Sequence, residues 1–132
     1  MRWRTPRIFR SLLAALGVLF AVSVSAEPIS SSEDLHKLIS GNSLYGRYNG
    51  VEFRQYMRDD GVLLVKIKGE EAVLHARWFI NDSAQYCEVW PDHSSCFGIG
   101  YGDGDRLEVL PQTPAQIESH IYRGAIPLEF EE

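Results

Sequence analysis

The sequence predicts an all-β fold: a small antiparallel up-and-down meander that closes into a barrel, preceded by one short N-terminal helix. Turn-forming residues recur every 8 to 12 positions from Asn49 onward. The segments between them have the length of strands, and several alternate apolar and polar residues. Two of the turns are Asn49-Gly50 and Asp60-Gly61, dipeptides that supply the positive φ angles that tight hairpins need. Regular spacing with short loops indicates that consecutive strands pair with each other.

The first 26 residues have the pattern of a secretory signal peptide. Four arginines lie within the first ten residues, and an apolar and small-residue run, 11–24, follows them. Val24 and Ala26 place small residues at the −3 and −1 positions of a cleavage site. The alternative is a membrane anchor, but a run of 14 residues is shorter than the roughly 20 that span a bilayer. We therefore expect a periplasmic or secreted protein that is cleaved near Ala26 and has no stable membrane anchor.

The remaining segment, 27–132, is expected to form a single small β-barrel-like domain. It carries nine Lys and Arg against eighteen Asp and Glu, a net charge of −9 with neutral histidines. An acidic chain without a basic cluster argues against nucleic acid or an anionic lipid surface as partner, because binding to phosphates requires Lys and Arg. The expected partner is a small molecule or a periplasmic protein.

A short helix is predicted over residues 30–40. Ser30 or Ser31 can cap its N-terminus, with an acidic residue three positions later. Leu35, Leu38 and Ile39 form one apolar stripe, and Gly41 ends the helix. We expect this stripe to pack over one end of the sheet structure that follows.

Strands are expected in the segments between the turns. In the segment 62–68, Leu63, Val65 and Ile67 face one side while Lys66 and Lys68 face the other. The expected strands are 43–48, 51–57, 62–68, 72–80, 84–90, 96–101 and 106–110.

Residues 113–123 are ambiguous. Their period-two pattern favours a strand that closes the sheet, whereas Thr113-Pro114 can cap and open a helix. Seven or eight meandering strands must protect their edges, and closure into a barrel does so. A two-sheet sandwich is the alternative. An eight-stranded barrel is wide enough either to be filled by side chains or to hold one small ligand.

The two cysteines are predicted to form a disulfide across a hairpin. If the turn centres on Pro91-Asp92, Cys87 lies directly opposite Cys96, where Cβ atoms come within bridging distance. An even cysteine count in an exported chain supports the same conclusion.

Other chemistry is disfavoured. Eight residues separate the cysteines, which fits neither a zinc ligand pair nor a redox motif, and His75 and His93 are isolated. The Gly102–Asp105 segment lacks the remaining ligands of a calcium loop. Ser43 lies in a motif one residue too long for a nucleophile elbow. We expect no enzyme activity, no cofactor and no metal.

Ten aromatic side chains lie in the predicted strands, and most of them are expected in the core, because aromatic residues suit half-buried strands. Trp78 and Phe79 are adjacent on one strand, so one of the two is expected outside the core or at a mouth. An aromatic surplus can line a pocket for a small apolar ligand or anchor a protein partner. The candidate ligand-binding residues are Tyr56, Trp78, Tyr86 and Trp90.

Several of these motifs occur in a fixed order that resembles a family of small exported proteobacterial proteins. That family is known only as a domain of unknown function, with the pattern GNT-L-x-G, Y-x-x-x-DG, G-x-W, C and C. The matching residues run from about 35 to 125, and Ser43 and Ala76 depart from the pattern, which tends to have Thr and Gly there. The residues that match the pattern are 41-GNSLYG-46, Tyr56, Asp60-Gly61, Trp78, 86-YC-87 with Trp90, and Cys96. The resemblance implies a periplasmic, disulfide-bearing, lipocalin-like small β domain and carries over no activity.

Two functions follow as expectations, and an enzyme, which reactivity in a broad hydrolase screen would reveal, is the third and least favoured class. The first is an exported non-enzymatic binding domain that takes a small apolar ligand in the barrel mouth. It predicts a cavity lined by inward-facing strand residues, with the helix near the mouth. The alternative is a periplasmic protein-interaction or enzyme-inhibitor module. It predicts a filled barrel with an exposed apolar patch, as in periplasmic inhibitors built on small barrels, to which the chain is loosely similar.

Overall fold

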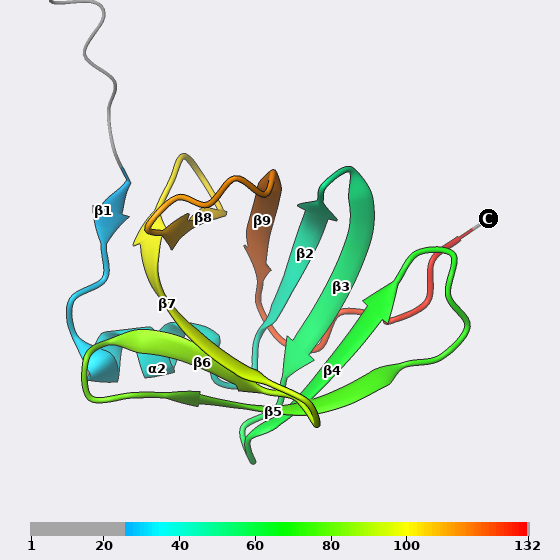
Figure 1. Cartoon of the computed structure of the whole chain (residues 1–132), viewed down its shortest axis with the longest axis horizontal. Helices are drawn as coiled ribbons and strands as arrows, with labels where there is room; N and C mark the ends of the chain where they lie inside the picture. Colours follow the sequence, from blue (N-terminus) through cyan, green and yellow to red (C-terminus); the bar gives the residue numbers. More distant parts are fainter. Residues whose placement is uncertain (1–25, 132) are drawn as a thin grey trace, which may run out of the picture.

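Figure 1 shows the computed structural model of the chain, which describes residues 26–131. The expected signal peptide, 1–26, lies outside the described residues except for Ala26. Within 26–131 there are one short helix and nine strands. Their bounds are β1 Glu27–Pro28, α2 Ser32–Ile39, β2 Ser43–Tyr48, β3 Val51–Met57, β4 Val62–Ile67, β5 Leu74–Ile80, β6 Gln85–Val89, β7 Ser94–Tyr101, β8 Arg106–Leu110 and β9 Ile117–Tyr122.

Strands β2 to β9 form a closed eight-stranded antiparallel barrel. Each strand pairs with the next in sequence, and β9 returns to pair with β2, so that Leu44 lies opposite Ile121. This confirms the predicted barrel and makes the ambiguous segment its closing strand. Strand β1 was not predicted; it lies outside the barrel and pairs with the end of β7.

The hairpins begin where the sequence predicted them. Asn49 and Gly50 have φ angles of 49° and 84°, which form the tight turn that matches the twist of the flanking strands. In the β6–β7 hairpin the amide of Trp90 donates to the carbonyl of His93 at 2.8 Å. This fixes the predicted register, and Cys87 lies opposite Cys96.

Glycine is required where β2 meets the closing strand. A Cβ atom added to Gly46 would lie 1.9 Å from the carbonyl oxygen of Glu118 on β9. The two backbones approach too closely for any side chain, so this glycine permits the barrel to close.

The helix covers one end of the barrel, next to β5 and β6 (Figure 1). Ser31 caps it by accepting a hydrogen bond from the amide of Asp34 at 3.2 Å. The predicted apolar stripe is buried against the barrel core. The ring of His36 lies near that of Trp78, with the ring centroids 5.5 Å apart. We call this helix-covered end the closed end. The opposite end carries the β2–β3, β4–β5 and β6–β7 turns and is called the open end.

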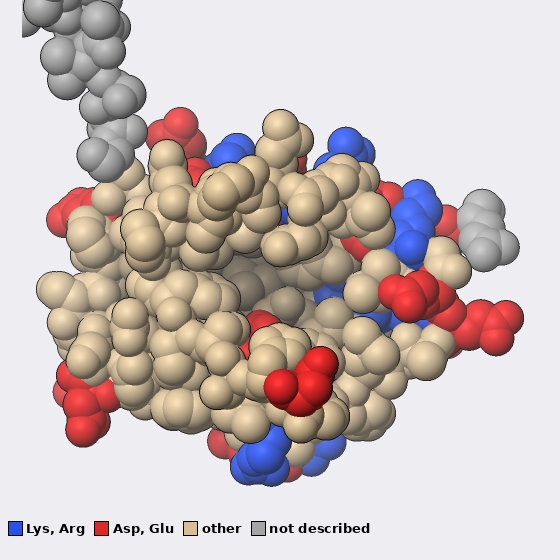
Figure 2. Space-filling view, viewed as in Figure 1, with Lys and Arg blue, Asp and Glu red and all other residues tan. Residues whose placement is uncertain are grey.

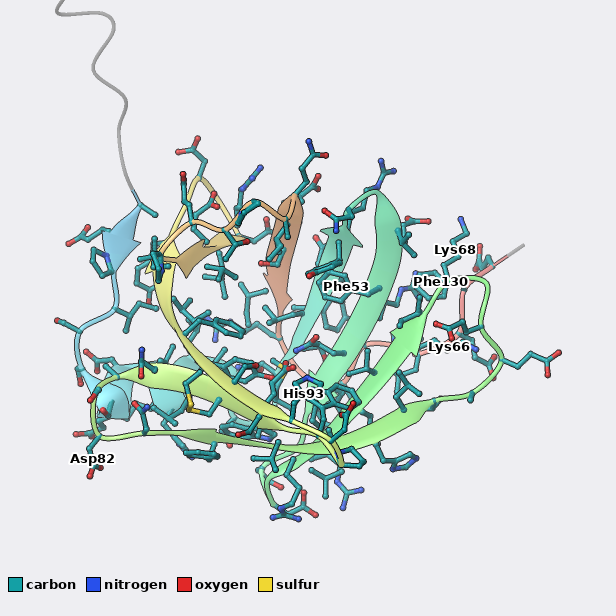
Figure 3. The ribbon with its side chains drawn as sticks, in the orientation of Figure 1. Phe53, Lys66, Lys68, Asp82, His93 and Phe130 are labelled. Atoms are coloured by element: carbon teal, nitrogen blue, oxygen red, sulfur yellow. A yellow bond between two sulfur atoms is a disulfide. The ribbon has the colours of Figure 1, made fainter. Side chains whose placement is uncertain are left out.

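The chain after β9 runs back over the outside of the barrel. The Ser43 hydroxyl donates to the carbonyl of Gly124 at 2.7 Å and accepts from the amide of Ile126 at 3.0 Å. Farther along, Arg54 donates to the carbonyls of Pro127 and Glu129 and lies over the ring of Phe130. Figure 3 shows Phe130 away from the barrel interior, on the same side of the view as Lys66 and Lys68.

Candidate functional site

The barrel interior is packed at the closed end and becomes accessible toward the open end. Most inward-facing residues near the helix are buried, among them Met57, Leu63 and Trp78, and Ile80 there is partly buried. Farther along the same strands, the inward-facing residues are only partly buried and pack against this core. They are Phe53 on β3, Ile67 on β4, Leu74 on β5, Trp90 after β6 and Phe97 on β7. The interior is therefore filled at the closed end and accessible at the open end. We call its accessible part, lined by these five residues, the cup.

The surface on the viewed face agrees with this gradient. Figure 2 shows a hollow near its centre, surrounded mostly by residues other than Lys, Arg, Asp and Glu. Figure 3 places Phe53 on the β3 wall and His93 at the tip of the β6–β7 hairpin. At that tip the rings of Trp90 and His93 are stacked, with centroids 6.4 Å apart.

A hydrogen-bonded network of polar side chains crosses the barrel interior between the packed closed end and the open end. Glu88 on β6 faces inward, because it pairs with Trp78 and shares a face with Tyr86. Its Oε2 accepts from the Tyr86 hydroxyl at 2.8 Å and from Gln55 Nε2 at 3.4 Å. Its Oε1 accepts from Trp90 Nε1 at 3.0 Å. Gln55 lies on β3, so these bonds cross the interior between strands that are not neighbours.

Glu88 has no cationic partner in the part of the chain that the structure describes, because none of the Lys, Arg or His side chains of residues 26–131 forms an ion pair with it. The donors that reach it are a phenol, an indole and an amide, all neutral. Burial, followed by the charge of Glu88 and its hydrogen bond, raises the pKa of Tyr86 well above its ordinary value. Tyr86 therefore stays a donor to the carboxylate throughout the physiological pH range.

The four predicted ligand-binding residues are placed differently. Tyr86 and Trp90 meet at Glu88. Trp78 is buried at the closed end, where its indole donates to the carbonyl of Arg58 at 2.7 Å and fixes the β3–β4 turn. Tyr56 pairs with Ser43 on the outer face of β3, so the structure does not bring it into the cup.

Glu88 and Gln55 were not predicted as functional residues. The signal was present in the alternation along β6, which puts Glu88 on the same face as Tyr86 and Trp90. A charged residue between two inward aromatic residues is an exception to the usual pattern of a half-buried strand.

The Cys87–Cys96 disulfide is confirmed, and it lies on the outer face of the barrel. The Cα atoms are 4.0 Å apart, as in a narrow pair without mutual backbone hydrogen bonds. Phe79 pairs with Cys87 on the same face and is 45% exposed, as predicted for one of the two adjacent aromatic residues of β5. Val89 is exposed beside them. These residues form a small apolar patch, which we call the disulfide face.

A separate crevice opens where β8 and β9 separate. These strands pair only at Arg106–His120 and Leu107–Ser119, and the loop after β8 leaves a cavity of about 530 Å³ beyond them. Its lining is mixed, with Arg47, Glu108 and Glu118 among the charged residues. Arg106 already pairs with Glu108 at 2.7 Å.

His120 lies between two carboxylates on the outer face. Its Nδ1 is 2.8 Å from Asp105 and its Nε2 is 3.0 Å from Glu118, while Tyr45 stacks on the ring. The hydrogen bond to Glu118, then that to Asp105, raises the pKa of His120, and the hydrogen bond from His120 lowers the pKa of each carboxyl. This cluster explains the Asp105 of the Gly-Asp turn as a structural residue.

The His120 cluster makes the stability of the fold depend on pH, because the pKa values of its members differ from their ordinary values. The raised pKa of His120 gives stability that is fully present below its ordinary value of 6.5 and lost as pH rises through the folded-state value. The lowered pKa values of Asp105 and Glu118 give stability that is present above their ordinary values of 3.8 and 4.5 and lost as pH falls through the folded-state values. The cluster stabilises the fold most between about pH 4.5 and 6.5.

Ser43 has no role as a nucleophile in this arrangement. Its hydroxyl is buried and bonds to two backbone groups of the chain after β9. Within residues 26–131, no three His, Cys, Asp or Glu side chains are grouped in a way that could hold a metal ion.

Comparisons with family models, with curated proteins and with solved structures find no match to this chain. The resemblance drawn from its motifs therefore stays a prediction, and the function is argued from the residues themselves. In the part of the chain that the structure describes, the one helix is too short to cross a membrane.

Proposed function

We propose that the chain is an exported, non-enzymatic binding domain that takes one small ligand with apolar surface into the open end of its barrel. The observation that supports this most is the gradient of burial along the interior. Most side chains that face inward at the helix end are buried, whereas Phe53, Ile67, Leu74 and Phe97 retain exposed surface. Concave apolar surface with a few placed polar groups is typical of small-molecule sites.

Export rests on the leader pattern and on the disulfide. Disulfides persist in oxidising compartments such as the periplasm and are rare in the cytosol. Intact-mass spectrometry of the purified protein tests this part: we expect a chain beginning at Glu27 with two fewer hydrogens than the reduced form. A mass that retains residues 1–26, or two thiols that alkylate without reductant, would contradict it.

Ligand binding is tested with the neutral fluorescent probe N-phenyl-1-naphthylamine. We expect saturable one-to-one binding, with emission enhanced in the cup. Phe53→Ala removes apolar surface from the β3 wall and is expected to weaken binding several-fold. Phe79→Ala is the matched control, because it removes the same side chain from the outer face. Absence of saturable binding, or a loss with Phe79→Ala alone, would refute the proposal.

A second function is favoured by one observation, the apolar disulfide face formed by Phe79, Val89 and the cystine. Exposed apolar patches on small domains often mark protein interfaces. In this alternative the chain is a protein-interaction or inhibitor module, and the Phe79→Ala variant is the one that loses function.

A further inference from the structure

The feature that calls for explanation is a carboxylate at the floor of the cup. Glu88 is partly buried and faces the open interior between Tyr86 and Trp90. Removing a charge from water is costly unless it is paired, and neutral donors compensate only in part. None of the described cationic side chains, in residues 26–131, pairs with it.

The hydrogen bonding leaves room for one more donor. A carboxylate offers about four acceptor sites on its two oxygens. Among the described residues, Oε2 accepts from Tyr86 and Gln55, whereas Oε1 accepts from Trp90 alone. Oε1 therefore has an unused acceptor site. Tyr86 and Gln55 also contact each other at 3.2 Å, which holds the carboxylate in a fixed orientation.

The walls above this carboxylate suit the remainder of an amphipathic cation. Phe53 and Trp90 contribute aromatic surface, and Ile67 and Leu74 contribute aliphatic surface. Aromatic faces attract cations through their quadrupole, so the walls tolerate an ammonium group that passes toward the floor. The segment 27–132, with its net charge of −9, also attracts cations over a longer range.

We infer that the cup takes a small amphipathic cation, whose protonated amine pairs with Glu88 and whose apolar part lies against Phe53 and Trp90. The inference rests on the proposed function, because it names the chemical class of the ligand for the same site. It adds a requirement that an apolar cup alone does not have, a positive charge at one end of the ligand.

The test compares three ligands that share an eight-carbon chain: octylammonium, 1-octanol and octanoate. Calorimetric titration of the wild-type protein is expected to give binding of octylammonium about tenfold tighter than 1-octanol, with octanoate the weakest, as for a charge-assisted contact in a partly buried site. Glu88→Gln preserves the shape of the side chain and is expected to bring octylammonium to within about twofold of 1-octanol. Binding of 1-octanol itself should be unchanged.

Glu33→Gln is the matched control. It removes one negative charge from the exposed surface of α2, at the closed end, and is expected to keep the preference for octylammonium. If Glu88→Gln fails to fold, the wild-type series and Glu33→Gln still decide the question. Binding of 1-octanol without preference for octylammonium would overturn this inference alone. An equal loss of preference in both variants would also overturn it, and binding of none of the ligands would overturn the proposed function too.

Discussion

Ser43→Ala tests how the chain after β9 is held to the barrel. In the wild-type protein the buried hydroxyl joins Gly124 and Ile126 through hydrogen bonds of 2.7 and 3.0 Å. Alanine leaves one carbonyl and one amide without these partners. A buried polar group without a partner costs about 1–3 kcal/mol. The carbonyl of Gly124 and the amide of Ile126 are only partly buried, so we expect the loss of both bonds to lower the free energy of unfolding by about 2–4 kcal/mol. That is a large part of the 5–15 kcal/mol typical of small domains.

Urea unfolding followed by circular dichroism measures this loss. Ser94→Ala is the matched control, because Ser94 is exposed on β7 and its change is expected to stay within about 0.5 kcal/mol. Ser43→Thr keeps the hydroxyl and is expected to lose less than Ser43→Ala. Hydrogen exchange at the amide of Ile126 gives a local readout, with faster exchange in Ser43→Ala. If Ser43→Ala behaved like Ser94→Ala in both measurements, the clamp would carry no stability and the reasoning would be refuted.

Three further perturbations have defined outcomes. Replacing Cys87 and Cys96 by serine should lower the free energy of unfolding by about 2.6 kcal/mol on the loop-entropy relation, measured by urea unfolding; a change below 1 kcal/mol would contradict it. His120→Gln should cost more stability at pH 6 than at pH 9, because the raised pKa of His120 stabilises the fold at the lower pH; an equal cost at both would refute the assignment. Gly46→Ala should separate β2 from β9, seen as faster amide exchange confined to that seam, since its Cβ would meet the backbone of Glu118.

The strand pairing could be predicted because it depends on local signals. Asn49-Gly50 specifies a two-residue turn, and the position of Pro91 sets the register that brings Cys87 opposite Cys96. Period-two alternation then assigns one face of each strand to the interior. Short loops force neighbours in sequence to be neighbours in space, and the eighth strand closes the barrel.

The site could be predicted only in part, because it depends on contacts between distant strands. Alternation gives the face of Tyr86 and Trp90, but it does not reveal that Gln55 reaches them from β3 across the interior. Tyr56 was a candidate by residue type, yet its register with Ser43 puts it on the outer face. Residue type without register therefore does not separate Tyr56 on the outer face from Tyr86 on the inner face.

The role of the GNS segment also depends on a long-range contact. The side chain of Asn42 donates to the carbonyl of Leu38 and accepts from the amide of Gly124. With Ser43 it joins the end of the helix, the start of the barrel and the chain after β9. Sequence reasoning marked this segment as a motif, but its partners lie more than 80 residues away.

The central claim, that ligands enter the open end of the barrel, is tested most directly by the two indole N–H signals that residues 27–132 give in a nitrogen–proton correlation spectrum. Trp90 lies in the cup beside Glu88, and Trp78 is buried at the closed end. On titration with 1-octanol, we expect a saturable shift of the Trp90 signal, while the Trp78 signal stays in place. A Trp90 signal that does not move while the backbone amides of Phe79 and Val89 shift would contradict it, because the ligand would then bind at the disulfide face.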